Sequence, residues 1–318
     1  MSKFYEIQPL DTLFFRGSTP MEAGMMNTVS MFPPPESVIR GAFWTVYCNQ
    51  RNKKYSEGLI TDDLTNEKKI PFEVEGFYIK KDDKIYLPCP ATWYYDSSEK
   101  ITTGSNLKDT ALIMAKNISE DIKEKLKMKS SAGDVVFVNP KNDAKSLLGA
   151  WVLLDFFKQP KDKFSEKDIL LAKDIYATES RTGVALDSNK KAKEGQLYSS
   201  SHIRMNDDIT FVIQLDDNIE FEENGNIFLG GEKRLSKYSL MEKPDVKFDN
   251  VGEQYLSLMP IEATKENLDM LVSSNKLIVT AGWDLAKGFH KPTTNWIPAG
   301  AVFNEKINNS CVALTQTK

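Results

Sequence analysis

Basic side chains gather in one stretch of the chain, residues 179–205, and phosphate groups are what such side chains attract. The middle of this stretch, residues 187–195, holds no large apolar residue and so cannot pack into a core. It carries three lysines, Lys190, Lys191 and Lys193. These residue types indicate contact with a polyanion. The alternative is an ordinary solvated loop, because charge runs usually face water.

The flanks of this stretch predict the element that positions the lysines. Short apolar segments at 184–186 and 197–198 lie on either side of the polar middle, which is typical of two strands joined as a long hairpin. Three more polar candidates lie at the base of the two strands: Arg181, His202 and Arg204.

A second candidate site follows the first predicted strand, residues 3–10. Residues 32–35, Phe-Pro-Pro-Pro, end one segment, and apolar residues at helical spacing predict a helix over 36–47. Ser37 is a candidate N-cap, Arg40 lies off the apolar stripe, and Arg16 lies in the connecting loop. A helix N-terminus after a loop favours an anion. A plain strand–helix unit is the alternative.

Glycines mark two further candidate loops. Paired glycines allow a backbone to approach a ligand or another strand, so the segment 229–234 is either a binding loop or a structural turn. Its candidates are Gly230, Gly231, Lys233 and Arg234. The loop 281–292 is glycine-bearing, basic and aromatic, with the candidates Lys287, Gly288, His290 and Lys291.

Other periodic segments outline the scaffold. We expect a hairpin from 77–80 and 84–87, a surface helix within 117–129, and strands at 208–216 and 296–303. We also expect a helix at 264–273 with Leu268, Leu271 and Val272 buried. Residues 160–163 are the best candidate for a boundary between two halves.

Composition limits the classes of function. The 318 residues carry 41 Lys and Arg against 45 Asp and Glu, a net charge of −4. A free-standing nucleic-acid binder is usually basic, so binding here would be local or shared with partner subunits. No apolar run approaches the roughly 20 residues of a membrane helix, and residues 1–11 do not resemble a signal peptide. We therefore expect a cytoplasmic protein without a membrane partner.

The residues that often carry catalysis or metals are few. The three cysteines, Cys48, Cys89 and Cys311, are far apart and fit neither a disulfide framework nor a zinc pattern. The two histidines are His202 and His290, and neither a phosphate-loop motif nor a clustered carboxylate motif for two metals is visible. We expect no metal, no cofactor and no catalytic residue.

Four ordered blocks carry a resemblance to a known family: residues 6–16, 32–43, 179–198 and 229–303. The run 181–187, Arg-Thr-Gly-Val-Ala-Leu-Asp, followed by Glu-Gly-Gln-Leu-Tyr at 194–198, resembles a segment of the RAMP proteins of type III-B CRISPR (Cmr) complexes. The match is to the subunit that holds the 5′ tag of the CRISPR RNA. Gly17 departs from the pattern, because the family often has an acidic residue after the arginine.

The resemblance implies an α+β fold of two tandem ferredoxin-like (RRM-like, RAMP) domains, with an inserted β-hairpin thumb and glycine-rich loops. We place the first domain at 1–160. The second, at 161–318, includes the hairpin 179–204. The candidates named above become RNA-binding residues in this interpretation.

The implied function is that of a non-catalytic RNA-binding subunit in antiviral defence. It would hold the 5′ tag and join the filament of backbone RAMP subunits to the large polymerase (cyclase) subunit. Target RNA near the tag–spacer junction is a further expected contact. The alternative from another class is a RAMP endoribonuclease that processes precursor CRISPR RNA, for which His202 is the candidate base.

Overall fold

Mixed α and β structure, rich in strands and with few helices, makes up the chain in the computed structural model. The structure describes residues 2–15, 17, 28–61, 68–97, 110–127, 136–137, 143–216, 218–249, 251–281, 283–284, 289–290 and 292–314. In these residues no helix is long and apolar enough to cross a membrane.

Two compact units share the chain, and each combines three separate stretches. Unit 1 comprises Met1–Glu75, Tyr176–Lys243 and Ile278–Trp296, and unit 2 comprises Gly76–Ile175, Pro244–Leu277 and Ile297–Lys318. This division differs from the consecutive halves 1–160 and 161–318 that we expected. The physical reason is strand pairing, since the first strand of the chain finds both of its neighbours beyond residue 200.

An antiparallel sheet forms the centre of unit 1, with the strand order β17-β1-β19-β18. Ile7 of β1 lies opposite Phe211 of β17 on one side and Tyr238 of β19 on the other. The bounds are β1 Lys3–Pro9, β17 Ile209–Leu215, β18 Asn224–Phe228 and β19 Leu235–Met241. The strands predicted at 3–10 and 208–216 are therefore confirmed.

Helix α1, Glu36–Gln50, packs near β18 and buries an aromatic face. Phe43 contacts Tyr5 and Phe221, with ring centroids 5.5 and 5.4 Å apart. Trp44, which lay outside the predicted stripe, is also buried and donates from Nε1 to the carbonyl oxygen of Tyr55. The predicted N-cap, Ser37, is wrong, because the helix begins at Glu36 after Pro35 and has no side-chain cap.

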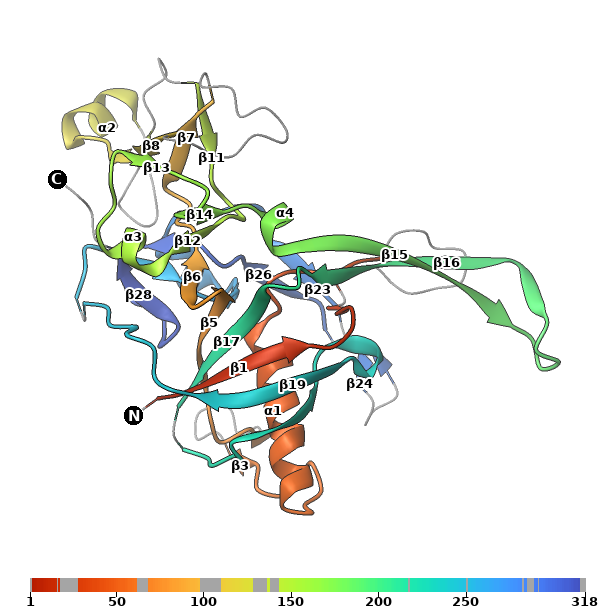
Figure 1. The fold of residues 1–318 in the computed structure, drawn as a ribbon. Helices are drawn as coiled ribbons and strands as arrows, with labels where there is room; N and C mark the ends of the chain where they lie inside the picture. Colours follow the sequence, from red (N-terminus) through yellow and green to blue (C-terminus); the bar gives the residue numbers. More distant parts are fainter. Residues whose placement is uncertain are drawn as a thin grey trace. The chain divides into compact units, whose positions relative to one another are not determined.

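The predicted hairpin is present in unit 1 and is longer than its apolar segments suggested. Strand β15, Tyr176–Leu186, pairs antiparallel with β16, Ala192–Met205, and Figure 1 shows the pair as an extended ribbon. The turn at its tip is short. Oδ1 of Asp187 accepts from the N–H groups of Asn189 and Lys191, both at 2.8 Å. These hydrogen bonds close the turn. The three lysines at or beside it are exposed to solvent.

Short elements complete unit 1. Strand β2 pairs parallel with β16, β3 pairs with β4, β23 pairs with β26, and β24 pairs with β25. Their bounds are β2 Thr28–Val29, β3 Ile60–Thr61, β4 Lys68–Lys69, β23 Ile278–Thr280, β24 Trp283–Asp284, β25 Phe289–His290 and β26 Thr294–Ile297.

Unit 2 contains the predicted hairpin, now β5 and β6, and the apolar segment that begins at Trp151. Trp93, Phe156 and Phe157 are buried together in its core. The bounds of its first elements are β5 Val74–Lys81, β6 Lys84–Pro88, β7 Trp93–Asp96, β8 Thr110–Met114, β9 Lys116–Asn117, α2 Glu120–Leu126, β10 Val136–Phe137, β11 Ala144–Ser146, β12 Trp151–Leu153, α3 Leu154–Lys158, β13 Lys163–Phe164, β14 Ile169–Leu170 and α4 Ala172–Ile175. The surface helix predicted within 117–129 is confirmed as α2, which has no buried residue.

Two predictions fail in the rest of unit 2. The helix expected at 264–273 ends at Asp269, and its candidate core residue Leu268 is 37% exposed. The strand expected at 296–303 is broken by a turn, in which Gly300 has a φ of +87°. The bounds are β20 Gln254–Ser257, β21 Ile261–Glu262, α5 Lys265–Asp269, β22 Leu271–Ser273, β27 Val302–Phe303 and β28 Cys311–Leu314.

Candidate nucleic-acid interface

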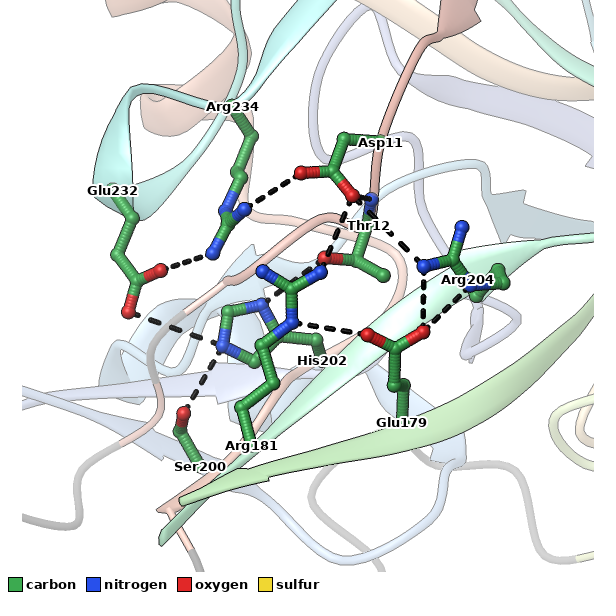
Figure 2. Close-up of polar contacts among 9 residues, drawn as sticks. All are labelled: Asp11, Thr12, Glu179, Arg181, Ser200, His202, Arg204, Glu232 and Arg234. Atoms are coloured by element: carbon green, nitrogen blue, oxygen red, sulfur yellow. Dashed lines mark hydrogen bonds and ion pairs between the residues drawn. The ribbon is translucent and has the colours of Figure 1, made fainter. Parts of the chain in front are cut away.

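The base of the hairpin brings together polar residues from three distant parts of unit 1. Glu179 and Arg181 alternate along β15, and Ser200, His202 and Arg204 alternate along β16. The register pairs Glu179 with His202 and Arg181 with Ser200, so the five side chains share one face. This face meets the segment after β1 and the loop after β18, as Figure 2 shows.

Asp11, two residues after the end of β1, is the centre of the cluster. Its Oδ1 accepts from Nη2 of Arg181 at 3.2 Å, and its Oδ2 accepts from Nη1 of Arg234 at 2.7 Å. Nη2 of Arg204 lies 3.9 Å from Oδ1. The backbone N–H of Thr12, followed by Arg181 and Arg234, holds the pKa of Asp11 below its usual value. The carboxylate therefore stays charged and links the hairpin to two other segments.

Two glutamates complete the pairing of the arginines. Oε2 of Glu179 accepts from Nε of Arg204 at 2.6 Å, and its Oε1 accepts from Nε of Arg181 at 3.0 Å. Glu232 pairs with Arg234. The hydrogen bonds from Arg204 and Arg181 lower the pKa of Glu179. Three carboxylates thus face three guanidiniums, and the cluster has no excess positive charge with which to attract a phosphate.

His202 lies inside this cluster and is fully buried. Its ring stacks on Phe14 with centroids 4.8 Å apart, Ser200 Oγ lies 3.0 Å from Nε2, and Thr12 Oγ1 lies 3.4 Å from Nδ1. The RNA contact that we predicted for His202 stays a prediction, and it would require the side chain to become exposed, because no part of it reaches solvent in this structure. The same burial separates it from any RNA that it would have to deprotonate as a nuclease.

Burial lowers the pKa of His202, which predicts a dependence of stability on pH. The folded histidine remains neutral at a pH where the unfolded one, with a pKa near 6.5, already takes up a proton. Stability is therefore complete above about pH 6.5 and falls as pH decreases below it, by at most about 1.4 kcal/mol per pH unit.

The measurement is the free energy of unfolding by urea from pH 7.5 to 5.5, in the wild type and in His202→Gln. We expect the variant to be less stable at pH 7.5 but to lose less stability on acidification. Parallel curves for the two proteins would contradict the assignment.

The paired glycines allow the loop between β18 and β19 to approach the segment after β1. Gly230 has a φ of +79°, and a Cβ at this position would lie 2.5 Å from the carbonyl oxygen of Phe14. The N–H of Gly231 donates to that same oxygen at 2.7 Å. Of the two alternatives for this loop, the structure therefore supports the structural turn. Lys233, also at positive φ, is exposed beside it.

The three tip lysines differ from the arginines at the base. The side chains of Lys190, Lys191 and Lys193 are exposed, and no ion pair among the described residues involves them. Arg40 is half-buried and pairs with Glu36 in α1 at 3.2 Å, while Ser37 is exposed beside it. Among the described residues, the three predicted lysines at the tip are therefore unpaired, whereas the predicted arginines, Arg40, Arg181, Arg204 and Arg234, are paired with carboxylates.

Some predicted residues cannot be placed. Arg16, Lys287, Gly288 and Lys291 lie outside the described residues, and for His290 only the backbone in β25 is described. Other functional neighbours were missed by the sequence analysis, and these are Asp11, Thr12, Glu179 and Glu232. A signal for the two glutamates exists, because each precedes an arginine by two residues.

Comparisons with known proteins agree with the resemblance. The family described as CRISPR-associated protein (Cas_Cmr3) matches residues 5–264. The chain belongs to this family, and its expected relation to the RAMP subunits of type III-B (Cmr) complexes is confirmed. None of the curated proteins matches the chain.

Solved structures show the same fold. One similar chain occurs in the cryo-EM structure of the Type III-B Cmr-beta bound to cognate target RNA, with 21% identity and a TM-score of 0.56. Another occurs in the state bound to cognate target RNA and AMPPnP, with 20% identity and a TM-score of 0.54. In both, the match covers 95% of this chain and 86% of the other.

Proposed function

We propose that this chain is the RNA-binding subunit of a type III-B CRISPR effector that holds the 5′ tag of the CRISPR RNA. It joins the filament of backbone RAMP subunits to the large polymerase (cyclase) subunit, and it is not itself catalytic. Its two units are RAMP domains of ferredoxin-like type. The family match and the relatives' occurrence in RNA-bound Type III-B Cmr-beta structures support this proposal.

One observation carries the RNA-binding part: the separation of charge along the hairpin. At the base, three arginines are neutralised by three carboxylates, which fixes the hairpin to the other segments of unit 1. At the tip, three lysines are exposed and unpaired among the described residues. Phosphates attract the unpaired charges far more than the neutralised ones. The tip is thus the part of the hairpin that contacts the guide.

The hairpin acts on the geometry of the guide at the tag–spacer junction. Val184 and Leu197 form a cross-strand pair near the tip, and both side chains are at least one-third exposed. An arm with exposed aliphatic side chains and basic groups at its end fits single-stranded RNA, which offers both unstacked bases and phosphates. Target RNA would meet the guide beside it.

Replacement of the three tip lysines by glutamine tests the proposal. The assembled complex should load guide RNA several-fold less tightly, because three phosphate contacts are lost. The slope of log affinity against log salt should decrease by about 2, since each contact to single-stranded nucleic acid contributes roughly 0.7. The measurement is guide binding by the reconstituted complex at four salt concentrations.

A matched control removes the same charge elsewhere. Lys265, Lys276 and Lys306 are exposed residues of unit 2, and their joint replacement by glutamine should leave the salt slope unchanged. Chemical probing of guide nucleotides at the tag–spacer junction provides a second readout. Equal slopes for the two triple variants, together with unchanged reactivity at the junction, would refute a role for the hairpin tip.

A further inference from the structure

The outer edge of β18 offers unpaired backbone groups. Leu229 N–H donates to the Arg234 carbonyl at 2.9 Å, and Leu240 N–H donates to the Glu223 carbonyl at 2.5 Å. The odd-numbered residues of β18 therefore direct their backbone groups toward β19. By alternation, the N–H and C=O groups of the even-numbered residues point away from β19, toward the open edge of the sheet. In the part of the chain that the structure describes, β19 is the only strand that pairs with β18.

This edge lacks the usual protection against strand addition. Natural edge strands carry charged side chains, prolines or bulges, which discourage pairing with another chain. Strand β18 reads Asn-Gly-Asn-Ile-Phe, with none of these features, and it pairs with β19 in continuous register. The side chains of Asn224, Asn226 and Phe228 are exposed. An open edge of five uncharged residues is suited to a further strand.

Two cavities of opposite character border the strand. An apolar cavity of about 470 Å³ is lined by Phe228 together with Phe14, Phe15, Gly41, Ala42 and Gly230. A polar cavity of about 610 Å³ is lined by Asn224 and Asn226 together with Glu6, Gln8, Lys237 and Ser239. Asn224, Asn226 and Phe228 alternate along the strand and so point to the same face of the sheet. An added strand would therefore meet polar surroundings beside Asn224 and Asn226 and apolar surroundings at the end that holds Phe228.

We propose that β18 accepts an extended segment of a partner protein as an additional strand. The segment carries uncharged polar residues where it passes Asn224 and Asn226, and at least one large apolar side chain enters the cavity beside Phe228. Backbone hydrogen bonds supply affinity and the cavities supply selectivity, as in other cases of strand addition. A protein strand fits better than RNA, because β18 contains no basic residue and the exposed Glu222 and Glu223 precede it.

Site-specific photo-crosslinking of the complex tests the proposal without destabilising the sheet. A benzophenone amino acid replaces Asn226 in the full chain, which is expressed with the other proteins of its effector complex. We expect crosslinks to one continuous segment of a partner protein that has uncharged polar residues followed or preceded by a large apolar one. Crosslinks to RNA alone, or no crosslink in an assembled complex, would overturn it.

Asn226→Pro provides the functional test. The lost N–H points outward, and proline is tolerated on an edge strand in this orientation. We expect at least a tenfold loss of the crosslinked partner from tagged complexes, whereas Asn226→Thr, which keeps the N–H, should retain it. Equal recovery with both variants would refute the proposal. The comparison requires that both variants unfold at the same temperature as the wild type. If either does not, the photo-crosslinking experiment alone decides whether the proposal holds. The tip lysines are unchanged, so this test fails independently of the RNA-binding proposal.

Discussion

Alanine at position 230 is expected to destabilise unit 1 by about 3 kcal/mol. Gly230 has a φ of +79° and a ψ of −160°, a region that is essentially restricted to glycine and that costs other residues roughly 1–3 kcal/mol. The added Cβ would lie 2.5 Å from the carbonyl oxygen of Phe14 and 2.9 Å from its neighbour Phe15. Such overpacking costs roughly another 1–3 kcal/mol.

The neighbours of Gly230 cannot easily move. The Phe14 carbonyl already accepts from Gly231, and the Phe14 ring stacks on buried His202. Urea unfolding of Gly230→Ala measures the loss. Gly149→Ala is the control, since Gly149 has a φ of +81° but nothing within 4 Å of a new Cβ. The variant at 230 should lose clearly more stability than the variant at 149, and equal losses would show that the contact with Phe14 is unimportant.

Replacing Asp11 with asparagine is expected to have the second-largest effect, a loss of about 2 kcal/mol. A hydrogen bond to a charged group contributes roughly 1.5–3 kcal/mol, and the half-exposed position of Asp11 limits the sum of its contacts with Arg181 and Arg234. Without the Asp11 carboxylate, Arg234 would keep Glu232 as its single carboxylate partner. Because the side chain of Arg234 is only 14% exposed, water could replace little of the lost contact. The hairpin base would lose its link to β1.

A double-mutant cycle measures this coupling. Asp11→Asn and Arg234→Gln should together cost clearly less than the sum of their separate effects, because each removes the same hydrogen bond. Arg204→Gln is the control, because its guanidinium lies 3.9 Å from Asp11 and forms no hydrogen bond with it. The effects of Arg204→Gln and Asp11→Asn should therefore be nearly additive. Additive losses for Asp11 and Arg234 would mean that the contact contributes nothing.

The lowered pKa of Asp11 gives the cycle a pH signature. A carboxylate with a depressed folded pKa stabilises the fold above the unfolded value, near 3.9, and this contribution is lost as pH falls through the folded pKa. The wild type should therefore lose stability below about pH 4 more steeply than Asp11→Asn does. Identical acid limbs would contradict the proposed role of Asp11.

Local patterns were sufficient to predict the hairpin and several strands. The polar tip and the apolar pair at 184 and 197 predicted β15 and β16, although the strands extend much further. The extension depends on Ser and Thr residues, which have no apolar alternation but pair across the strands. The helix expected at 264–273 failed for a related reason, since residues after Asp269 pair with β27 instead.

The charge balance at the hairpin base could not be predicted from residue types alone. Arg181 and Arg234 appeared available for RNA, but their partner Asp11 is 170 and 223 residues away in sequence. The acid that precedes each arginine by two positions was the local indication of pairing. Burial of His202 likewise results from Phe14 and Thr12, which reach it from the N-terminal segment. Tertiary contacts decided both outcomes.

The interleaved path of the chain has a consequence during synthesis on the ribosome. Strand β1 emerges first, yet its two neighbours, β17 and β19, begin at residues 209 and 235. At the usual elongation rate of 5–20 residues per second, about 10–40 s pass before β1 can pair. The nascent chain must keep this apolar segment from aggregating during that interval. Both units are completed late, because the last stretch of unit 1 begins at Ile278 and that of unit 2 begins at Ile297.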